Sequence, residues 1–287
     1  RSLGHRNFRL FFGGQLVSLT GTWMQQIALS WLVYRLTDSP LLLGVVVFSG
    51  QVPTFLLASF AGVIADRSNR HKILIITQTL AMVQALVLTG IVLSGVVQVW
   101  HIIGLSVFIG IVNAFDIPTR QAFFIEMIEK KEDLGNAIAL NSSIVNSARF
   151  LGPTIGGLVI AGFGEGVCFL INGLSYMAVL AALLAMRIKY EKKAASDRHI
   201  LSELKEGFQY TYGFLPIRTL LLLVAAISLA GVPYSVLMPV FARDILGGGP
   251  STLGFLMASA GIGSLIGTVY LASRSTIRGL GRIIVFA

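Results

Sequence analysis

The stretch PLLLGVVVFSGQVPTFLLASFAGVIADRSNRHK, residues 40–72, decides the fold class of this chain. Its first 26 residues contain no charged side chain, and the seven that follow include two arginines, one lysine and one aspartate. About 20 apolar residues in a helix are enough to cross the hydrocarbon core of a bilayer. The run shows no strict alternation of apolar and polar residues, which a membrane strand would need. We therefore predict a membrane-spanning helix that ends in a charged loop.

The same pattern recurs along the chain. Of the 287 residues, 55% are hydrophobic and 12% charged, whereas soluble domains have about 25% charged residues. A large apolar surface must therefore face lipid, and we predict an all-α polytopic membrane protein. The expected spanning helices are eight, at about 10–34, 41–64, 72–94, 99–121, 136–160, 166–187, 216–242 and 251–273. A ninth is expected from Gly281, so we expect a fragment of a longer protein.

Basic residues predict the orientation. With the N-terminus inside, the outer loops hold only Arg35 and Arg243, and Arg120 and Arg149 lie within predicted spans. The other lysines and arginines fall in inner segments, which is the bias that orients membrane proteins. We expect a bacterial-type inner (plasma) membrane protein with a cytoplasmic N-terminus. This distribution explains the net charge of +9 without a nucleic-acid partner.

The sequence offers no support for enzyme chemistry. The four histidines lie at helix ends or in loops without metal-ligand spacing, and Cys168 is the single cysteine. The chain contains no Gly-x-x-x-x-Gly-Lys-Ser/Thr loop for ATP. We predict a non-enzymatic protein without cofactor or metal.

Three motifs carry a resemblance to a known family. The loop from Gly62 through Asp66, Arg67 and Arg70 to Lys72 has a glycine, then Asp-Arg, then a basic cluster, although Asn69 stands where a glycine is usual. The fifth helix contains Gly152-Pro153-Thr-Ile-Gly156-Gly157. The segments Asp116-Ile-Pro-Thr-Arg120 and Leu237–Asp244 complete the set. Together they resemble the drug- and siderophore-exporting branch of the major facilitator superfamily.

That resemblance implies two six-helix bundles, here cut short after about eight helices. A weak internal repeat agrees, because Ser39–Gly44 and Ser251–Gly254 open corresponding helices at an offset of roughly 210 residues, and parallel repeats are common in transporters. We expect an N-terminal bundle at 1–190, a cytoplasmic loop at 191–215 and the start of a second bundle at 216–287. The loop has an amphipathic pattern at Ile200, Leu201, Leu204, Phe208 and Tyr212, typical of a helix lying on a membrane surface.

Ionisable groups inside a bilayer are costly and are functional candidates. We expect Asp116 near the cytoplasmic surface. In the family a carboxylate there pairs with the basic loop, so we predict a network of Asp66, Arg67, Arg70 and Asp116 that holds the inner gate. Gly62, Lys72 and Arg120 belong to the same predicted region. Asp116 as a proton carrier is a second hypothesis.

The polar residues of the first helix are typical of a water-filled cavity, and the family lines its cavity with helices 1, 4, 7 and 10. Our pathway candidates are Gln15, Thr22, Gln26, Asn113, Arg149 and Tyr234. For any one of them, hydrogen bonding between helices is an equal alternative. Arg149 is expected near mid-membrane, where it could hold an anionic group, pair with a carboxylate or reach backbone carbonyls.

The expected function is export of a small amphipathic molecule, a drug or siderophore, by alternating access and proton antiport, by a monomer. Uptake or lipid translocation on the same fold is one alternative. A non-transporting membrane receptor or scaffold is another.

Overall fold

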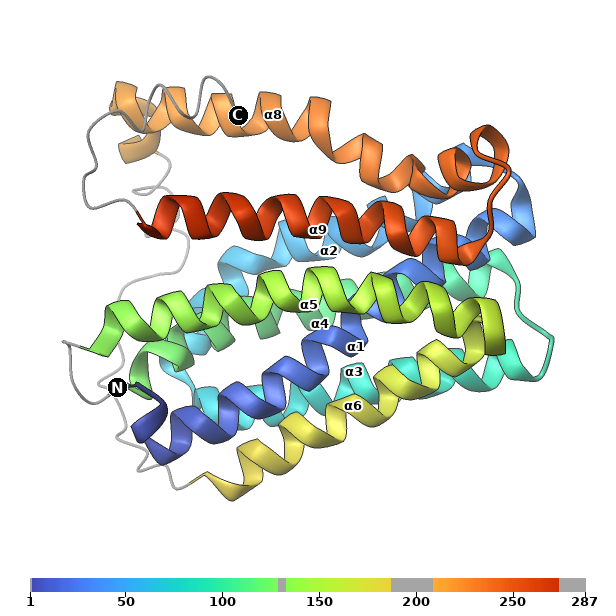
Figure 1. Cartoon of the computed structure of the whole chain (residues 1–287). Helices are drawn as coiled ribbons and strands as arrows, with labels where there is room; N and C mark the ends of the chain where they lie inside the picture. Colours follow the sequence, from blue (N-terminus) through green and yellow to red (C-terminus); the bar gives the residue numbers. More distant parts are fainter. Residues whose placement is uncertain (1, 129–132, 187–208, 274–287) are drawn as a thin grey trace.

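The computed structural model describes residues 2–128, 133–186 and 209–273. Long helices that run side by side make up this part of the chain (Figure 1). After a short 3-10 helix (Ser2–Gly4) come α1 (Arg6–Thr37), α2 (Pro40–Arg67), α3 (Arg70–Leu93), α4 (Val99–Glu126), α5 (Leu134–Phe163), α6 (Glu165–Ala185), α8 (Leu215–Val240), a π-helical turn η3 (Phe241–Ile245) and α9 (Pro250–Ser273). The all-α prediction is confirmed.

Local capping sets two of the boundaries. Ser39 precedes α2 and accepts the backbone N–H of Leu42, with Pro40 at the first helical position. Asn69 accepts the backbone N–H of Lys72 at the start of α3, with φ −71° and ψ 100°. Asn69 is therefore an extended N-cap, and the left-handed backbone that a glycine would favour is not needed there.

The fourth helix is longer than expected and continues to Glu126 instead of ending at 121. Its last turns bury Phe123 and Phe124. These rings make edge-on contacts with Phe11 and Phe8 of α1, at centroid distances of 6.0 and 5.7 Å. Burial of aromatic surface thus extends α4 into the segment between the predicted fourth and fifth spans, which was expected to be a loop.

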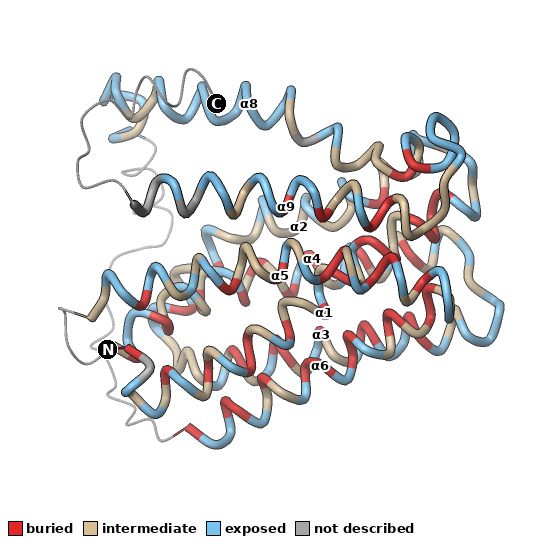
Figure 2. Tube along the Cα trace, viewed as in Figure 1, coloured by how far each residue is buried: buried red, intermediate tan, exposed pale blue. Residues whose placement is uncertain are grey.

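Glycines allow the helices to approach closely. α1 packs against α6 and α5, α2 against α4, and α3 against α4 and α6. A Cβ on Gly21 would lie 2.4 Å from Oγ of Ser175, and one on Gly110 would lie 2.2 Å from the backbone oxygen of Gly50. Figure 2 shows buried residues along these facing sides and exposed residues on the outer faces.

Seven of the described helices are long and apolar enough to cross a membrane. They are α2 to α6, α8 with η3, and α9. α1 is not among them although it has 32 residues, because its polar side chains lower its hydropathy. Large apolar side chains lie exposed, among them Phe55 at 83% and Leu229 at 79%, as lipid-facing surfaces do. The protein is thus a multi-pass membrane protein.

Two sequence predictions lie outside the described residues. They are most of the amphipathic pattern, of which only Tyr212 is described, and the ninth helix after Gly281.

Candidate functional site

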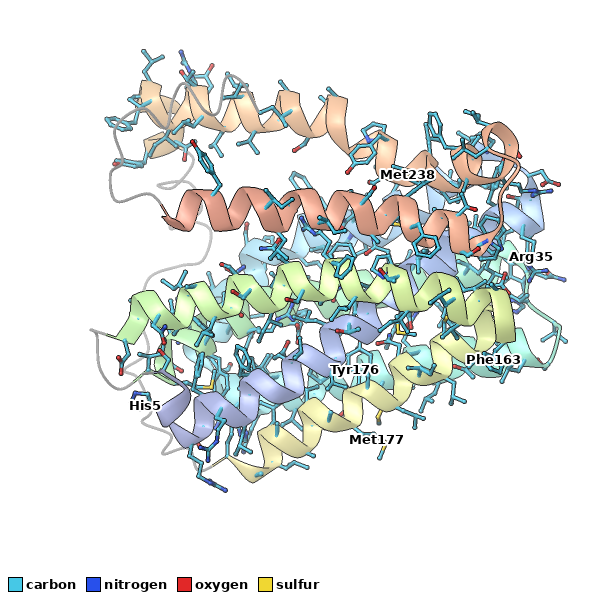
Figure 3. All side chains as sticks on the ribbon, viewed as in Figure 1. His5, Arg35, Phe163, Tyr176, Met177 and Met238 are labelled. Atoms are coloured by element: carbon cyan, nitrogen blue, oxygen red, sulfur yellow. The ribbon has the colours of Figure 1, made fainter. Side chains whose placement is uncertain are left out.

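The helix ends gather at two opposite ends of the molecule (Figure 3). His5 marks one of them, and Arg35 and Phe163 mark the other. We refer to them as the His5 end and the Arg35 end. The predicted site residues divide between these two ends and the middle of the helices.

Arg70 forms an ion-pair cluster at the His5 end. Its Nη2 lies 2.5 Å from Oδ1 of Asp66, and its Nη1 pairs with Glu126 at the end of α4. Asp66 is 67% exposed and Glu126 41% exposed. Glu126 was missed as a site residue because it falls in the predicted loop. Only the extension of α4 brings it to Arg70.

The other residues of the predicted gate loop lie on either side of Arg70 in the chain. A Cβ on Gly62 would meet nothing within 4 Å, so no helix approaches it here. Arg67 and Lys72 are exposed. His71 next to them points inward, with its Nε2 2.8 Å from the carbonyl oxygen of Leu183 at the end of α6.

Asp116 is 4% exposed and lies among polar groups of three helices. Its Oδ1 accepts from Oγ1 of Thr77 at 2.8 Å and from Nε2 of Gln78 at 2.7 Å, both on α3. Its Oδ2 lies 3.4 Å from Nε of Arg120, one helical turn along α4. Arg120 donates to Oε1 of Gln15 on α1 at 3.2 Å. We call these five residues the Asp116 cluster.

The structure therefore divides the predicted gate network. Arg70 is held by Asp66 and Glu126, while Asp116 is held by Thr77, Gln78 and Arg120. Asp116 is separated from Glu126 by ten residues of helix, or about 15 Å at 1.5 Å per residue. It lies only about 5 Å from the middle of α4 by the same rise. The expectation that Asp116 lies near the membrane surface stays a prediction, although α4 is longer than predicted.

Among the described residues, two buried side-chain atoms have no hydrogen-bond partner. They are Oε1 of Gln78, a member of the Asp116 cluster, and Oγ1 of Thr119, on the same helix as Asp116. Such atoms cost free energy unless another state of the protein or a water satisfies them.

The pathway candidates on α1 share one helical face and differ in exposure. Gln15 is buried at 5% exposure and belongs to the Asp116 cluster. Thr22 and Gln26, four residues apart, are exposed on the same face of α1. Asn113 of α4 is half-buried, and Tyr234 of α8 is 52% exposed. Four of these five are thus exposed or half-buried, whereas Gln15 is buried.

A second polar network connects three of the first six helices. Gln25 donates to Oε1 of Gln84 at 3.0 Å and accepts from Nδ2 of Asn172 at 2.7 Å. Asn172 is fully buried and accepts from Ser175 at 3.2 Å. This network joins α1, α3 and α6. It was missed because Gln84 and Asn172 are single polar residues in apolar runs.

Arg149 lies at the middle of α5 and is exposed. Its guanidinium carbon is 5.1 Å from the centroid of the Trp23 ring on α1. Among the described residues no carboxylate lies within ion-pair distance of Arg149. Sequence analysis missed Trp23, since nothing in the sequence relates positions 23 and 149.

The glycines of the fifth-helix motif serve two different interfaces. Cβ atoms on Gly152 and Gly156 would lie 2.4 Å from Cβ of Trp23 and 2.7 Å from Cγ2 of Ile27, both on α1. A Cβ on Gly157 would instead lie 2.9 Å from Cα of Gly254 on α9. Pro153 cannot donate to the carbonyl of Arg149, its usual helical partner, yet α5 continues through it.

Polar contacts at the Arg35 end join α1 to the α8–α9 connection. Arg243 Nη1 lies 2.5 Å from Oδ1 of Asp38, and its guanidinium lies 5.5 Å from the Tyr34 ring centroid. The hydroxyl of Tyr34 donates to Asp244. Arg35 binds both carboxylate oxygens of Glu165 at 2.8 and 3.2 Å. Toward the His5 end, α8 diverges from α9 (Figure 1).

The described residues contain no group of three or more His, Cys, Asp or Glu side chains that could hold a metal ion. The site is thus a set of charged and amide side chains inside a helical membrane protein. Such an arrangement can bind polar groups and hold protons.

Comparison with known proteins gives one family match, to the model described as transmembrane secretion effector, over residues 2–287. The chain is similar to the staphyloferrin A transporter of Staphylococcus aureus, with 27% identity over 92% of this chain and 66% of that protein. It is also similar to the multidrug efflux pump Tap of Mycolicibacterium fortuitum (24%; 91% and 67%) and to macrolide efflux protein A of Streptococcus pyogenes (23%; 92% and 65%). The chain spans about two thirds of the length of these relatives.

Proposed function

Because the chain belongs to the transmembrane secretion effector family of the major facilitator superfamily, and is therefore a non-enzymatic transporter, we propose that the whole protein exports a small amphipathic molecule in exchange for protons. Relatives named as efflux pumps and as a siderophore transporter support export. We further propose that the N-terminus is cytoplasmic, that the protein works as a monomer, and that α8 and α9 begin a second bundle.

The observation that carries the proposal is the buried carboxylate of Asp116. A charged side chain this deep in a membrane helix is costly and is a functional candidate by default. Arg120 is its counter-ion, and Arg120 also reaches Gln15 on α1. Asp116 of α4 and Gln15 of α1 both bind Arg120. A movement of α1 against α4 would therefore draw Arg120 away from Asp116. If Arg120 left, the buried negative charge would lose its partner, and proton uptake would neutralise it.

Contacts at the Arg35 end support alternating access. There the Tyr34–Asp244 and Asp38–Arg243 pairs link α1 to η3, which we assign to the second bundle. In the proposed cycle these pairs open when the Asp66–Arg70–Glu126 cluster at the His5 end engages the second bundle. Rocking of two bundles about a central site is the general mechanism of such repeats.

The test is efflux from cells that express the full-length protein. Cells are loaded with a fluorescent lipophilic cation or a catecholate siderophore, and the proton gradient is collapsed midway. We expect efflux to stop with the gradient and to be lost in Asp116→Asn. The matched control is Asp133→Asn, which removes a carboxylate paired with His5 outside the spans and should retain efflux.

Each alternative predicts a different result. Normal proton-coupled efflux in Asp116→Asn would remove Asp116 from the mechanism. Probe entry driven by the gradient in a direction-resolved flux assay would indicate uptake. No flux of any probe, with the protein confirmed in the membrane, would favour lipid translocation or a non-transporting role.

A further inference from the structure

We propose that Arg149 and Trp23 form an anion-binding subsite, so that the preferred substrate of this transporter carries an anionic group beside an apolar ring or chain. This inference deepens the proposed function and rests on it. It starts from the position of Arg149 at the middle of α5. A charged arginine at the centre of a bilayer costs about 2.5–3.5 kcal/mol on insertion scales. Such a cost requires water, a counter-ion or a ligand nearby.

The packing places Arg149 where two groups of helices meet. α5 packs against α1 on one side and α9 on the other (Figure 1). A Cβ on Gly261 of α9 would lie 3.0 Å from the backbone oxygen of Arg149, so α9 touches the same turn of α5. Substrate sites in transporters built from repeats lie near the midplane at the interface between the repeats.

The side chain of Arg149 faces an open polar surface. Gly21 of α1 packs on α6, and Gly152 of α5 packs on the backbone of α1 beside Trp23. The exposed face of α1, with Thr22 and Gln26, lies between these two contacts, and Trp23 stands at its edge toward α5. Arg149 over the Trp23 ring is thus directed toward that face.

The chemistry of the pair favours an anion with an apolar neighbour. The contact with the Trp23 ring is made by the charge of the guanidinium and leaves its N–H groups available as donors. Within the described ranges no acidic side chain pairs with Arg149, whereas Arg35, Arg70, Arg120 and Arg243 each pair with at least one. A planar fork of N–H donors fits a carboxylate, sulfonate or catecholate oxygen pair.

The aromatic partner of the subsite is fixed by packing. The close approach at Gly152 holds the Cβ of Trp23 against α5, one turn from Arg149. One of the two partners is therefore held in place before a ligand arrives, and preorganisation of this kind raises affinity.

The test uses two probes with one skeleton, 8-anilinonaphthalene-1-sulfonate and its neutral analogue N-phenyl-1-naphthylamine. Their dissociation constants are measured by fluorescence with the full-length protein in nanodiscs, after subtraction of empty nanodiscs. We expect the sulfonate to bind at least tenfold more tightly than the neutral probe. Arg149→Gln should weaken sulfonate binding about tenfold or more and change neutral binding less than twofold.

The matched control is Arg218→Gln. Arg218 also stacks on an aromatic ring, that of Tyr212 at 5.4 Å, near the start of α8, and its replacement should change neither constant. Arg149→Lys keeps the charge but loses the planar fork. It should weaken sulfonate binding three- to tenfold, which tests the subsite even if the glutamine variant does not fold.

An equal loss of binding of both probes in Arg149→Gln would indicate a structural role for Arg149 and overturn the inference. Unchanged sulfonate binding in both Arg149 variants would also overturn it. Binding at equilibrium needs no transport. Selective sulfonate binding without efflux of any probe would therefore contradict the proposed export and support the subsite. Proton-coupled efflux that depends neither on probe charge nor on Arg149 would support export and contradict the subsite.

Discussion

Replacement of Gly157 by alanine tests whether the α5–α9 contact holds the conformation seen here. The new Cβ would lie 2.8 Å from the carbonyl oxygen of Pro250 and 2.9 Å from Cα of Gly254. Both atoms are backbone and cannot rotate away. Ordinary contact begins at 3.4 Å, so α5 and α9 would have to separate by about 0.6 Å, the difference between 3.4 and 2.8 Å.

Forcing extra volume into a packed interface costs about 1–3 kcal/mol. Between two conformations that differ in this contact, such a cost corresponds to about a 5- to 150-fold change in their equilibrium. The matched control is Gly162→Ala on the same helix, where a Cβ would meet nothing within 4 Å. Both variants gain the same helix propensity, about 1 kcal/mol at most, so their difference isolates the steric effect.

The assay is the distance between spin labels in the full-length protein. Leu36→Cys and Ile245→Cys place labels at exposed positions across the Arg35 end, and Cys168→Ala removes the buried native thiol. We expect Gly157→Ala to shift the distance distribution toward longer values, and Gly162→Ala to match the parent. Identical distance distributions in the two alanine variants would refute the claim that α5–α9 packing holds this conformation.

Two further predictions use the same protein. Gly21→Ala should lower the thermal unfolding midpoint, because its Cβ would lie 2.4 Å from Oγ of Ser175 and overpacking costs about 1–3 kcal/mol. The control, Gly13→Ala on the same helix, should leave the midpoint unchanged, because its Cβ would meet nothing within 4 Å. Equal midpoints in the two variants would contradict the α1–α6 packing. Arg243→Gln should open the labelled end less than Gly157→Ala does, because its pair with Asp38 is exposed and such pairs contribute about 0.2–1 kcal/mol. The effect should shrink in 1 M salt, and a shift that persists there would indicate a role other than charge pairing.

The helices could be predicted from sequence because apolar run length is a local property. Seven predicted spans meet the length and hydropathy requirement in the structure. The end of α4 could not be predicted in this way. Residues 122–126 include Glu126 and look like a loop, but Phe123 and Phe124 pack on Phe8 and Phe11. Contacts with residues more than 100 positions away decided that boundary.

The types of site residue could also be read from sequence, since charged groups in apolar runs are conspicuous. Their partners could not. Asp116 was expected beside the basic loop, and it contacts Thr77, Gln78 and Arg120 instead. Gln15 was expected to line a pathway and is buried against Arg120.

The sequence by itself determined that this is an all-helical membrane protein of the transporter superfamily, because hydropathy and short motifs are carried by neighbouring residues. Tertiary structure alone decided which charges meet. Close approach at glycines such as Gly21, Gly152 and Gly157 sets how each helix is rotated against its neighbour. That rotation places Trp23 under Arg149 and Thr77 beside Asp116. The pattern of residues within one helix does not specify its rotation against another helix.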